Sequence, residues 1–256
     1  MAISIKSRHE VELMRKAGEI LAKCFQEVAA NIAVGVTTAE LNRIAEDFFQ
    51  QHNGIPSFKG VPGMTKGAPV FPAAMCASVN EEVIHGIPGK RALLDGDIVS
   101  IDMGVIYKGY HSDMARTFCV GAVSEETKRL LSVTEESFFK GIEQAVPGNR
   151  IADISAAIQK HVEEAGFSVV RDYVGHGIGT DMHEPPQVPN YVEHGRGVRL
   201  QAGMTLAIEP MVNVGGYQVR VLPNYWTVVT RDHSLSAHYE NTIVVCDGNP
   251  EILSAV

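Results

Sequence analysis

The sequence lacks the features that would place it among disulfide-rich, nucleic-acid-binding or membrane-spanning proteins. Its four cysteines lie far apart and form no CxxC pair, which argues against a structural thiolate zinc site and favours reduced thiols. The formal net charge of −8 indicates no basic surface for nucleic acid or anionic lipid. No apolar run approaches the roughly 18 residues of a membrane span, and the N-terminal residues lack the apolar stretch of a secretory signal. We therefore expect a cytoplasmic globular protein that binds neither nucleic acid nor membrane.

The chain of 256 residues instead alternates helix signals with short β-type segments, which predicts an α/β (α+β) fold. A capping box that begins at Ser7 predicts an amphipathic helix to about residue 30, and another at Thr37 predicts a helix that ends near Gly54. Two further helices are predicted, from Ser124 to about residue 145 and over about residues 152–165. Strands are predicted over residues 75–79, 98–105, 115–120, 169–174, 205–208, 218–221, 227–229 and 241–246. A loop rich in glycine and proline, residues 54–72, precedes the first of these strands.

The two halves of the sequence resemble each other. His85-Gly86-Ile87 parallels His176-Gly177-Ile178, and the segment from Gly96 to Asp102 parallels the segment from Gly203 to Glu209 without a gap. Under that alignment Asp102 and Glu209 occupy equivalent positions. This gap-free strand match ends in a carboxylate both times and is the stronger evidence for an internal repeat. We predict a single catalytic domain over residues 1–256, built from two pseudo-symmetric halves at about 7–121 and 124–250, with a site where the halves meet.

Five acidic and imidazole side chains sit in segments that are predicted to be strands or strand ends, where apolar residues are normal. They are Asp102, Asp113, His176, Glu209 and Glu240. Four buried carboxylates disfavour one another's ionisation, and two divalent cations would cancel their formal charge of −4. The oxygen-rich set with one imidazole suits Mn, Fe(II), Co(II) or Zn. The pattern therefore predicts a dinuclear metal site that activates water for hydrolysis.

The two aspartates are expected on one β-hairpin. If Lys108-Gly109 is its two-residue turn, Tyr107 faces Tyr110, and Asp102 becomes a diagonal, same-face neighbour of Asp113 at about 7–8 Å or less. Two carboxylates so placed can hold a metal pair roughly 3.5–4 Å apart. Taken alone, the same pattern equally fits two solvated aspartates on an exposed face. The four carboxylates and the histidine together favour the metal site.

Several strings in this order and spacing closely resemble type I methionine aminopeptidases, the peptidase M24 enzymes of the pita-bread fold. They are Ser78-Val79-Asn80-Glu81, His85-Gly86-Ile87-Pro88, Gly96 to Asp102, Gly175-His176-Gly177-Ile178-Gly179, His183-Glu184, Pro186-Gln187-Val188, Ile208-Glu209-Pro210-Met211-Val212 and Ser234 to Glu240. The likeness extends from Ile5 to about Asp247. It implies a curved antiparallel sheet covered by two helix pairs, and a methionyl aminopeptidase that removes the initiator methionine of nascent proteins and peptides, preferably before a small second residue.

The resemblance also implies roles for individual residues. All five side chains would hold the two divalent ions, with Asp113 and Glu240 bridging them and His176 on one ion. A metal-bridging hydroxide would attack the first peptide bond, with Glu209 as proton shuttle and His183 stabilising the oxyanion. His85 would assist the scissile nitrogen. For both His85 and His183 the alternative is a structural histidine whose hydrogen bonds are satisfied within the protein. A methionine pocket is implied by Phe71, Cys76, Met182 and Trp226, residues that would otherwise be ordinary core.

The sequence departs from the family pattern around the pocket. Phe71 stands where tyrosine is common, Met182 where an aromatic is usual, and Asn241 where histidine is common; the loop over residues 58–70 looks longer than usual. Two other readings remain open: a proline-specific aminopeptidase or dipeptidase of the same fold, and a non-enzymatic binding module of that fold. The expected partner is the N-terminus of a peptide or nascent chain, with transient proximity to the ribosome, and the expected state is a monomer.

Overall fold

The computed structural model describes residues 3–63 and 67–255, which form four helices and fifteen strands. The helices are α1 (Arg8–Ala30), α2 (Thr38–Gln51), α3 (Glu125–Ile142) and α4 (Ile151–Glu164). The strands of the first half are β1 (Ile55–Pro56), β2 (Met75–Val79), β3 (Glu82–Ile84), β4 (Ile98–Tyr107) and β5 (Tyr110–Cys119). Those of the second half are β6 (Ser168–Val169), β7 (Gly175–Gly177), β8 (Glu184–Val188), β9 (Thr205–Ile208), β10 (Met211–Asn213), β11 (Val219–Val221), β12 (Val228–Thr230), β13 (Ser236–His238), β14 (Glu240–Val244) and β15 (Glu251–Ile252).

The caps expected at the helix starts are present. The side chains of Ser7 and Thr37 each accept a hydrogen bond from the backbone N–H of the glutamate three residues on. The side chain of each glutamate accepts a hydrogen bond from the backbone N–H of the cap residue, so α1 and α2 begin with capping boxes. Ser124 caps α3 through the N–H of Thr127. Because these contacts are local in sequence, the four predicted helices match the observed ones to within a few residues.

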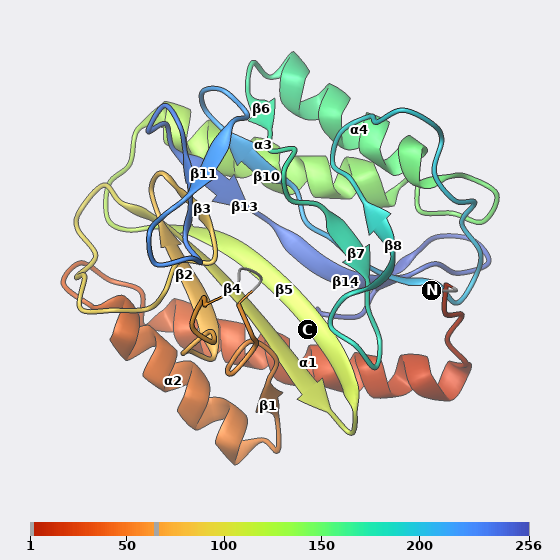
Figure 1. Ribbon diagram of the computed structural model, residues 1–256, viewed down its shortest axis with the longest axis horizontal. Coiled ribbons are helices and arrows are strands. Elements are labelled where there is room, and N and C mark those ends of the chain that lie inside the picture. Colours follow the sequence, from red (N-terminus) through yellow and green to blue (C-terminus); the bar gives the residue numbers. More distant parts are fainter. Residues whose placement is uncertain (1–2, 64–66, 256) are drawn as a thin grey trace.

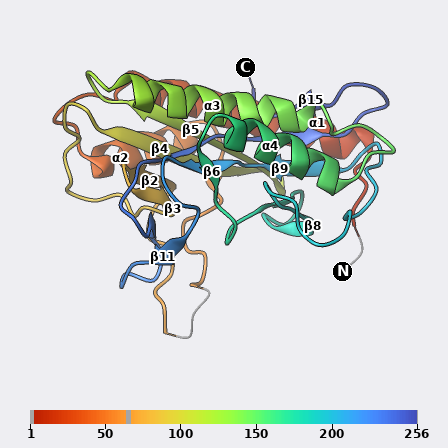
Figure 2. The ribbon, with the colours of Figure 1, turned by 90° about the horizontal axis from the view of Figure 1, so that it is seen from above.

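A nine-stranded antiparallel sheet runs through both halves in the order β1-β4-β5-β14-β9-β7-β8, with β2 beside β4 and β15 beside β14. Two three-stranded sheets, β13-β10-β6 and β11-β12-β3, flank it. The helices lie on one side of the curved main sheet, while β8, β11 and the loop before β2 project on the other (Figures 1 and 2). The α/β architecture expected from the sequence, an antiparallel sheet covered by two helix pairs, is confirmed.

Each helix pair has its own hydrophobic core. The α1–α2 pair packs on β2 and β4 through residues such as Leu21, Phe49 and Ile101, and the α3–α4 pair packs on β9 and β14 through residues such as Phe138 and Ile243. No helix in the described ranges is both long and apolar enough to cross a membrane. Both helix pairs cover the same face of the main sheet, and the acidic side chains lie on its opposite face.

One predicted strand is largely wrong. The expected strand over residues 169–174 is observed only as β6, which ends at Val169. There the chain leaves β10, the partner of β6, bends over residues 170–174, and joins β9 through β7 in the main sheet. The chain must bend here to pass from one sheet to the other, and the residues of this segment alone do not indicate the bend.

Candidate active site

The hairpin that carries both aspartates has the register expected from its turn. Lys108 and Gly109 have φ values of 49° and 85°, the left-handed pair that a tight two-residue hairpin turn requires. Tyr107 therefore pairs with Tyr110. Further along the ladder Ala115 pairs with Asp102 and Gly104 with Asp113, so the two carboxylates project from the same face of β4 and β5.

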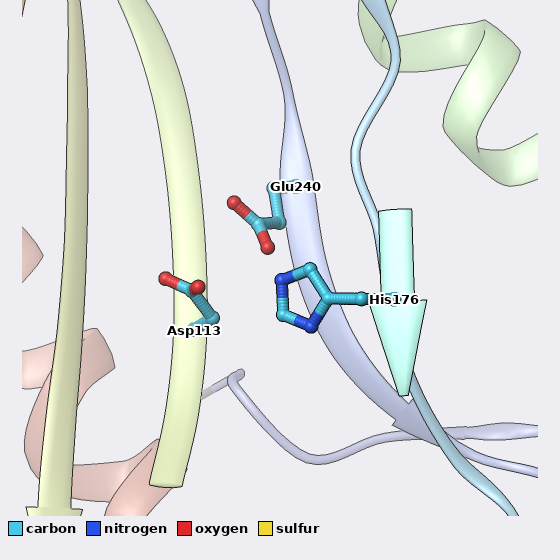
Figure 3. Close-up of side chains that lie close together, drawn as sticks. All are labelled: Asp113, His176 and Glu240. Atoms are coloured by element: carbon cyan, nitrogen blue, oxygen red, sulfur yellow. The ribbon is translucent and has the colours of Figure 1, made fainter. Parts of the chain in front are cut away.

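Three side chains converge on this face from three different strands. Ligand atoms of Asp113 in β5, His176 in β7 and Glu240 in β14 all lie within 4.8 Å of one another (Figure 3). Glu240 pairs with Ala115 across the β5–β14 ladder, and His176 pairs with Ala207 in β9. The middle of the main sheet thus brings together residues that belong to opposite halves of the sequence.

The other two predicted ligands border this cluster. Glu209 follows β9, and its Oε1 lies 3.5 Å from Nε2 of His176. The backbone carbonyl of Glu209 accepts a hydrogen bond of 3.0 Å from Asn190. Asp102 is buried in β4 opposite Cys76 of β2. All five predicted ligands therefore lie around one part of the sheet.

Electrostatics at the cluster are unfavourable for bare carboxylates. Burial raises the pKa of Asp102 to about 7. Burial, together with the charge of a neighbouring carboxylate, raises the pKa values of Asp113, Glu209 and Glu240 well above their usual range. Oδ1 of Asp102 and Oε1 of Glu240 are buried and have no hydrogen-bond partner among the described residues. Divalent cations would coordinate these buried, unpaired carboxylate oxygens and offset their mutual repulsion. This donor set therefore fits a metal centre.

His176 has the hydrogen bonding of a neutral metal-ligating imidazole. Its Nδ1 lies 2.8 Å from the backbone carbonyl of Gly177, which fixes that nitrogen as the donor and leaves Nε2 as a free acceptor toward the cluster. Burial lowers the pKa of His176 to about 3, so the ring is uncharged near neutral pH. Gly177 leaves no room for a side chain, because a Cβ there would overlap the carbonyl of Pro185.

The two other predicted histidines, His183 and His85, differ in their surroundings. His183 is an exposed residue, and its ring lies 4.4 Å, centroid to centroid, from the ring of His176. Surrounding protein atoms still lower the pKa of His183, and burial lowers that of His85 to about 4. His85 adopts φ = 58°, an uncommon backbone conformation for a non-glycine residue and one that clusters at functional sites.

Three of the four predicted pocket residues form one apolar cluster. Phe71 and Cys76 are buried together, and the Phe71 ring lies 5.1 Å from the ring of Trp226 in an edge-to-face arrangement. Trp226 is in turn 6.3 Å from the His85 ring, which connects this cluster to the acidic face. Met182 instead packs against a different cluster that includes Met14, so its place in a pocket stays a prediction.

The loop before β2 is tied to this apolar cluster. The indole N–H of Trp226 donates a hydrogen bond of 3.0 Å to the carbonyl of Pro69, and the backbone of Phe71 bonds to Gly60 and Val61. Residues 64–66 of the predicted 54–70 loop lie outside the described residues. Both ends of the loop therefore contact the predicted pocket.

Two features of the site were not identified from the sequence. His238 is 2% exposed, its Nε2 lies 3.8 Å from Oε2 of Glu240, and burial lowers its pKa to about 3. Its position two residues before Glu240 in an extended segment was the available signal. Lys6 forms a largely buried ion pair with Glu184, the residue after His183, and only the tertiary structure brings that lysine there.

The comparison with known protein families explains this arrangement. Residues 12–247 match the model of metallopeptidase family M24. The chain belongs to metallopeptidase family M24. This M24 member is therefore a metal-dependent peptidase, and its architecture is the pita-bread fold of that family.

Curated relatives of this M24 metallopeptidase match over almost their whole length. It is 56% identical to the methionine aminopeptidase of Clostridium perfringens over 254 residues, which cover 99% of both chains. It is 50% identical to methionine aminopeptidase 1 of Bacillus subtilis, covering 99% of this chain and 100% of the relative.

Solved structures distinguish two branches of the family. The crystal structure of methionine aminopeptidase from Thermotoga maritima has a TM-score of 0.94 and 44% identity, with complete coverage of both chains. Prolidase from Pyrococcus furiosus has a TM-score of 0.75 and 22% identity, and only 65% of that chain is covered, which shows a shared fold alone. The similarity is therefore closer to the aminopeptidase branch in sequence, shape and length.

Proposed function

We propose that this M24 metallopeptidase is a methionine aminopeptidase, which hydrolyses the first peptide bond of peptides and nascent proteins and releases the N-terminal methionine. The observation that carries the proposal is the 50–56% identity to curated methionine aminopeptidases over essentially the full chain. We further propose a preference for a small second residue. For the methionine side chain itself, the half-buried Trp226 and the buried Phe71 support an apolar pocket beside the acidic face.

We propose that Asp102, Asp113, His176, Glu209 and Glu240 hold two divalent cations, drawn from Co, Mn, Fe(II) or Zn. The support is the convergence of ligand atoms from β5, β7 and β14 and the raised pKa values of the four carboxylates. When bound, such ions supply positive charge that activates water and polarises a carbonyl. The same charge would favour ionised carboxylates, which reverses the direction in which burial alone moves their pKa values.

The remaining groups of the site are suited to proton transfer and hydrogen bonding. Glu209 lies beside His176, and its raised pKa suits a carboxylate that takes a proton from the attacking water and passes it to the leaving nitrogen. Burial lowers the pKa values of His183 and His85, and a neutral imidazole keeps one N–H that can donate. We propose that His183 donates to the scissile carbonyl oxygen and that His85 contacts the scissile nitrogen.

The proposed partner is the free N-terminus of a peptide. We also propose that the protein works in the cytoplasm as a monomer, on chains close to the ribosome. Its four cysteines are free thiols, two of them buried, which fits a reducing compartment.

The deciding experiment compares three substrates with metal-reconstituted protein: Met-Ala-Ser, Ala-Pro and N-acetyl-Met-Ala-Ser. Release of free methionine from the unblocked methionine peptide alone is expected. Equal or faster cleavage of Ala-Pro would instead support the proline-specific alternative, and no turnover of any peptide would support a binding module of this fold.

The role of Glu209 has its own test. Glu209→Ala should abolish turnover and weaken metal binding, because it removes both a ligand and the proposed proton carrier. The matched control is Glu193→Ala, which removes an exposed glutamate whose carboxylate accepts a hydrogen bond from the Tyr191 hydroxyl. Full activity of the Glu209 variant would exclude that residue from the mechanism.

A further inference from the structure

The ring of His238 is buried beside the candidate metal centre without a hydrogen bond. The residue is 2% exposed, and neither Nδ1 nor Nε2 has a partner in the part of the chain that the structure describes. A neutral imidazole carries one N–H donor and one acceptor, and a buried polar group left unpaired is costly. Hydrogen bonds to the described residues therefore do not explain why a histidine is buried at this position.

The backbone of His238 is fixed on both sides. Its N–H donates to Oγ1 of Thr117 at 2.8 Å, and its carbonyl accepts from the same hydroxyl at 3.0 Å. Oγ1 of Thr117 also lies 2.8 Å from Oγ of Ser100, and His238 pairs with Met211 in the β10–β13 ladder. Only rotation about the side-chain torsions can move the ring.

The nearest acidic group to the ring is the carboxylate of Glu240. Nε2 of His238 lies 3.8 Å from Oε2 of Glu240, so a ring rotation that shortens this distance by about 1 Å would form a hydrogen bond. The other carboxylate oxygen, Oε1, is buried without a partner. Metal-ligating carboxylates are themselves held by hydrogen bonds that set their orientation.

We propose that His238 is a positioning residue for Glu240. Its Nε2–H donates to Oε2 and fixes the carboxylate in the orientation that faces Asp113 and His176. This inference rests on the proposed metal site, but it assigns a role to a side chain outside the ligand set.

The test measures metal affinity and coordination in chelator-stripped protein, without any substrate. His238→Leu removes the donor at similar volume, whereas His238→Gln keeps an N–H donor. Calorimetric titration with Co(II) should show about 10- to 100-fold weaker binding for His238→Leu, and a small change for His238→Gln. The visible spectrum of bound Co(II) should change in the leucine variant and resemble the wild type in the glutamine variant.

Ser236→Ala is the matched control, because it removes another buried, unpaired polar group from the same strand. Its Co(II) affinity and spectrum should equal those of the wild type. Wild-type affinity in His238→Leu, or an equal loss in His238→Gln, would overturn the proposal, the second outcome indicating a direct ligand or a packing role. Failure of the wild-type protein to bind Co(II) would refute the metal site itself, whatever the outcome of the peptide assay.

Discussion

Replacing Asp102 by asparagine should stabilise the metal-free protein, and the gain should grow with pH. Asp102 is 8% exposed, and its Oδ1 has no hydrogen-bond partner among the described residues. Burial raises its pKa from 3.8 to about 7 in the folded state. The folded protein therefore binds this proton more tightly than the unfolded chain does. The stabilisation is complete below pH 3.8 and is lost as the pH rises through about 7.

The magnitude follows from the size of the shift. One pKa unit corresponds to about 1.4 kcal/mol, so a shift of about three units is worth about 4 kcal/mol in all. Roughly 3 kcal/mol of that is lost between pH 5 and pH 8, because the group titrates fully in the unfolded chain below that window. The buried histidines shift in the opposite sense, with pKa values lowered to about 3 or 4. Comparing the variant with the wild type at each pH cancels their contribution.

The measurement is urea unfolding of both proteins at pH 5 and pH 8 in the presence of a chelator. The stability of Asp102→Asn relative to the wild type should rise by about 3 kcal/mol between the two pH values. Asp47→Asn, an exposed aspartate of α2, controls for the substitution itself. Adding Co(II) or Mn(II) at pH 8 should then stabilise the wild type more than the variant. A pH-independent difference between the two proteins would refute the account of Asp102 as a carboxyl whose pKa is raised by burial.

Three further predictions test the supports of the site. Lys6→Met should lower the free energy of unfolding by about 3 kcal/mol, because it leaves the largely buried carboxylate of Glu184 without its cation. In urea unfolding the double variant with Glu184→Gln should recover part of that loss, and additive losses would contradict the pairing. Gly177→Ala should weaken Mn(II) binding in titration calorimetry, because the new Cβ would overlap a backbone carbonyl of β8 and displace the strand of His176; unchanged affinity would contradict this. Trp226→Phe should speed limited proteolysis of the 58–70 loop, since it removes the indole hydrogen bond to that loop; an unchanged cleavage rate would show that the bond does not restrain it.

Local interactions explain which elements could be predicted from the sequence. The caps at Ser7, Thr37 and Ser124 bond within one helical turn, so they reveal where helices begin without knowledge of the fold. The Lys108-Gly109 turn likewise fixes the register of β4 and β5, because its length determines which residues pair. The end of β6 at Val169 could not be predicted from the sequence. It depends on the pairing of β6 with β10 and of β7 with β9, which belong to different sheets.

The sequence alone determined the helices, the central hairpin and a set of acidic and imidazole residues whose chemistry suits paired divalent ions. Tertiary structure decided how those residues meet: Asp113, His176 and Glu240 come within 4.8 Å only because β5, β14, β9 and β7 lie in that order in one sheet. It also decided that His238 is buried against Glu240 and that Met182 packs against the cluster that contains Met14. The physical reason is that turns and caps are energetically local, whereas burial, pKa shifts and ligand distances are set by neighbours remote in the chain.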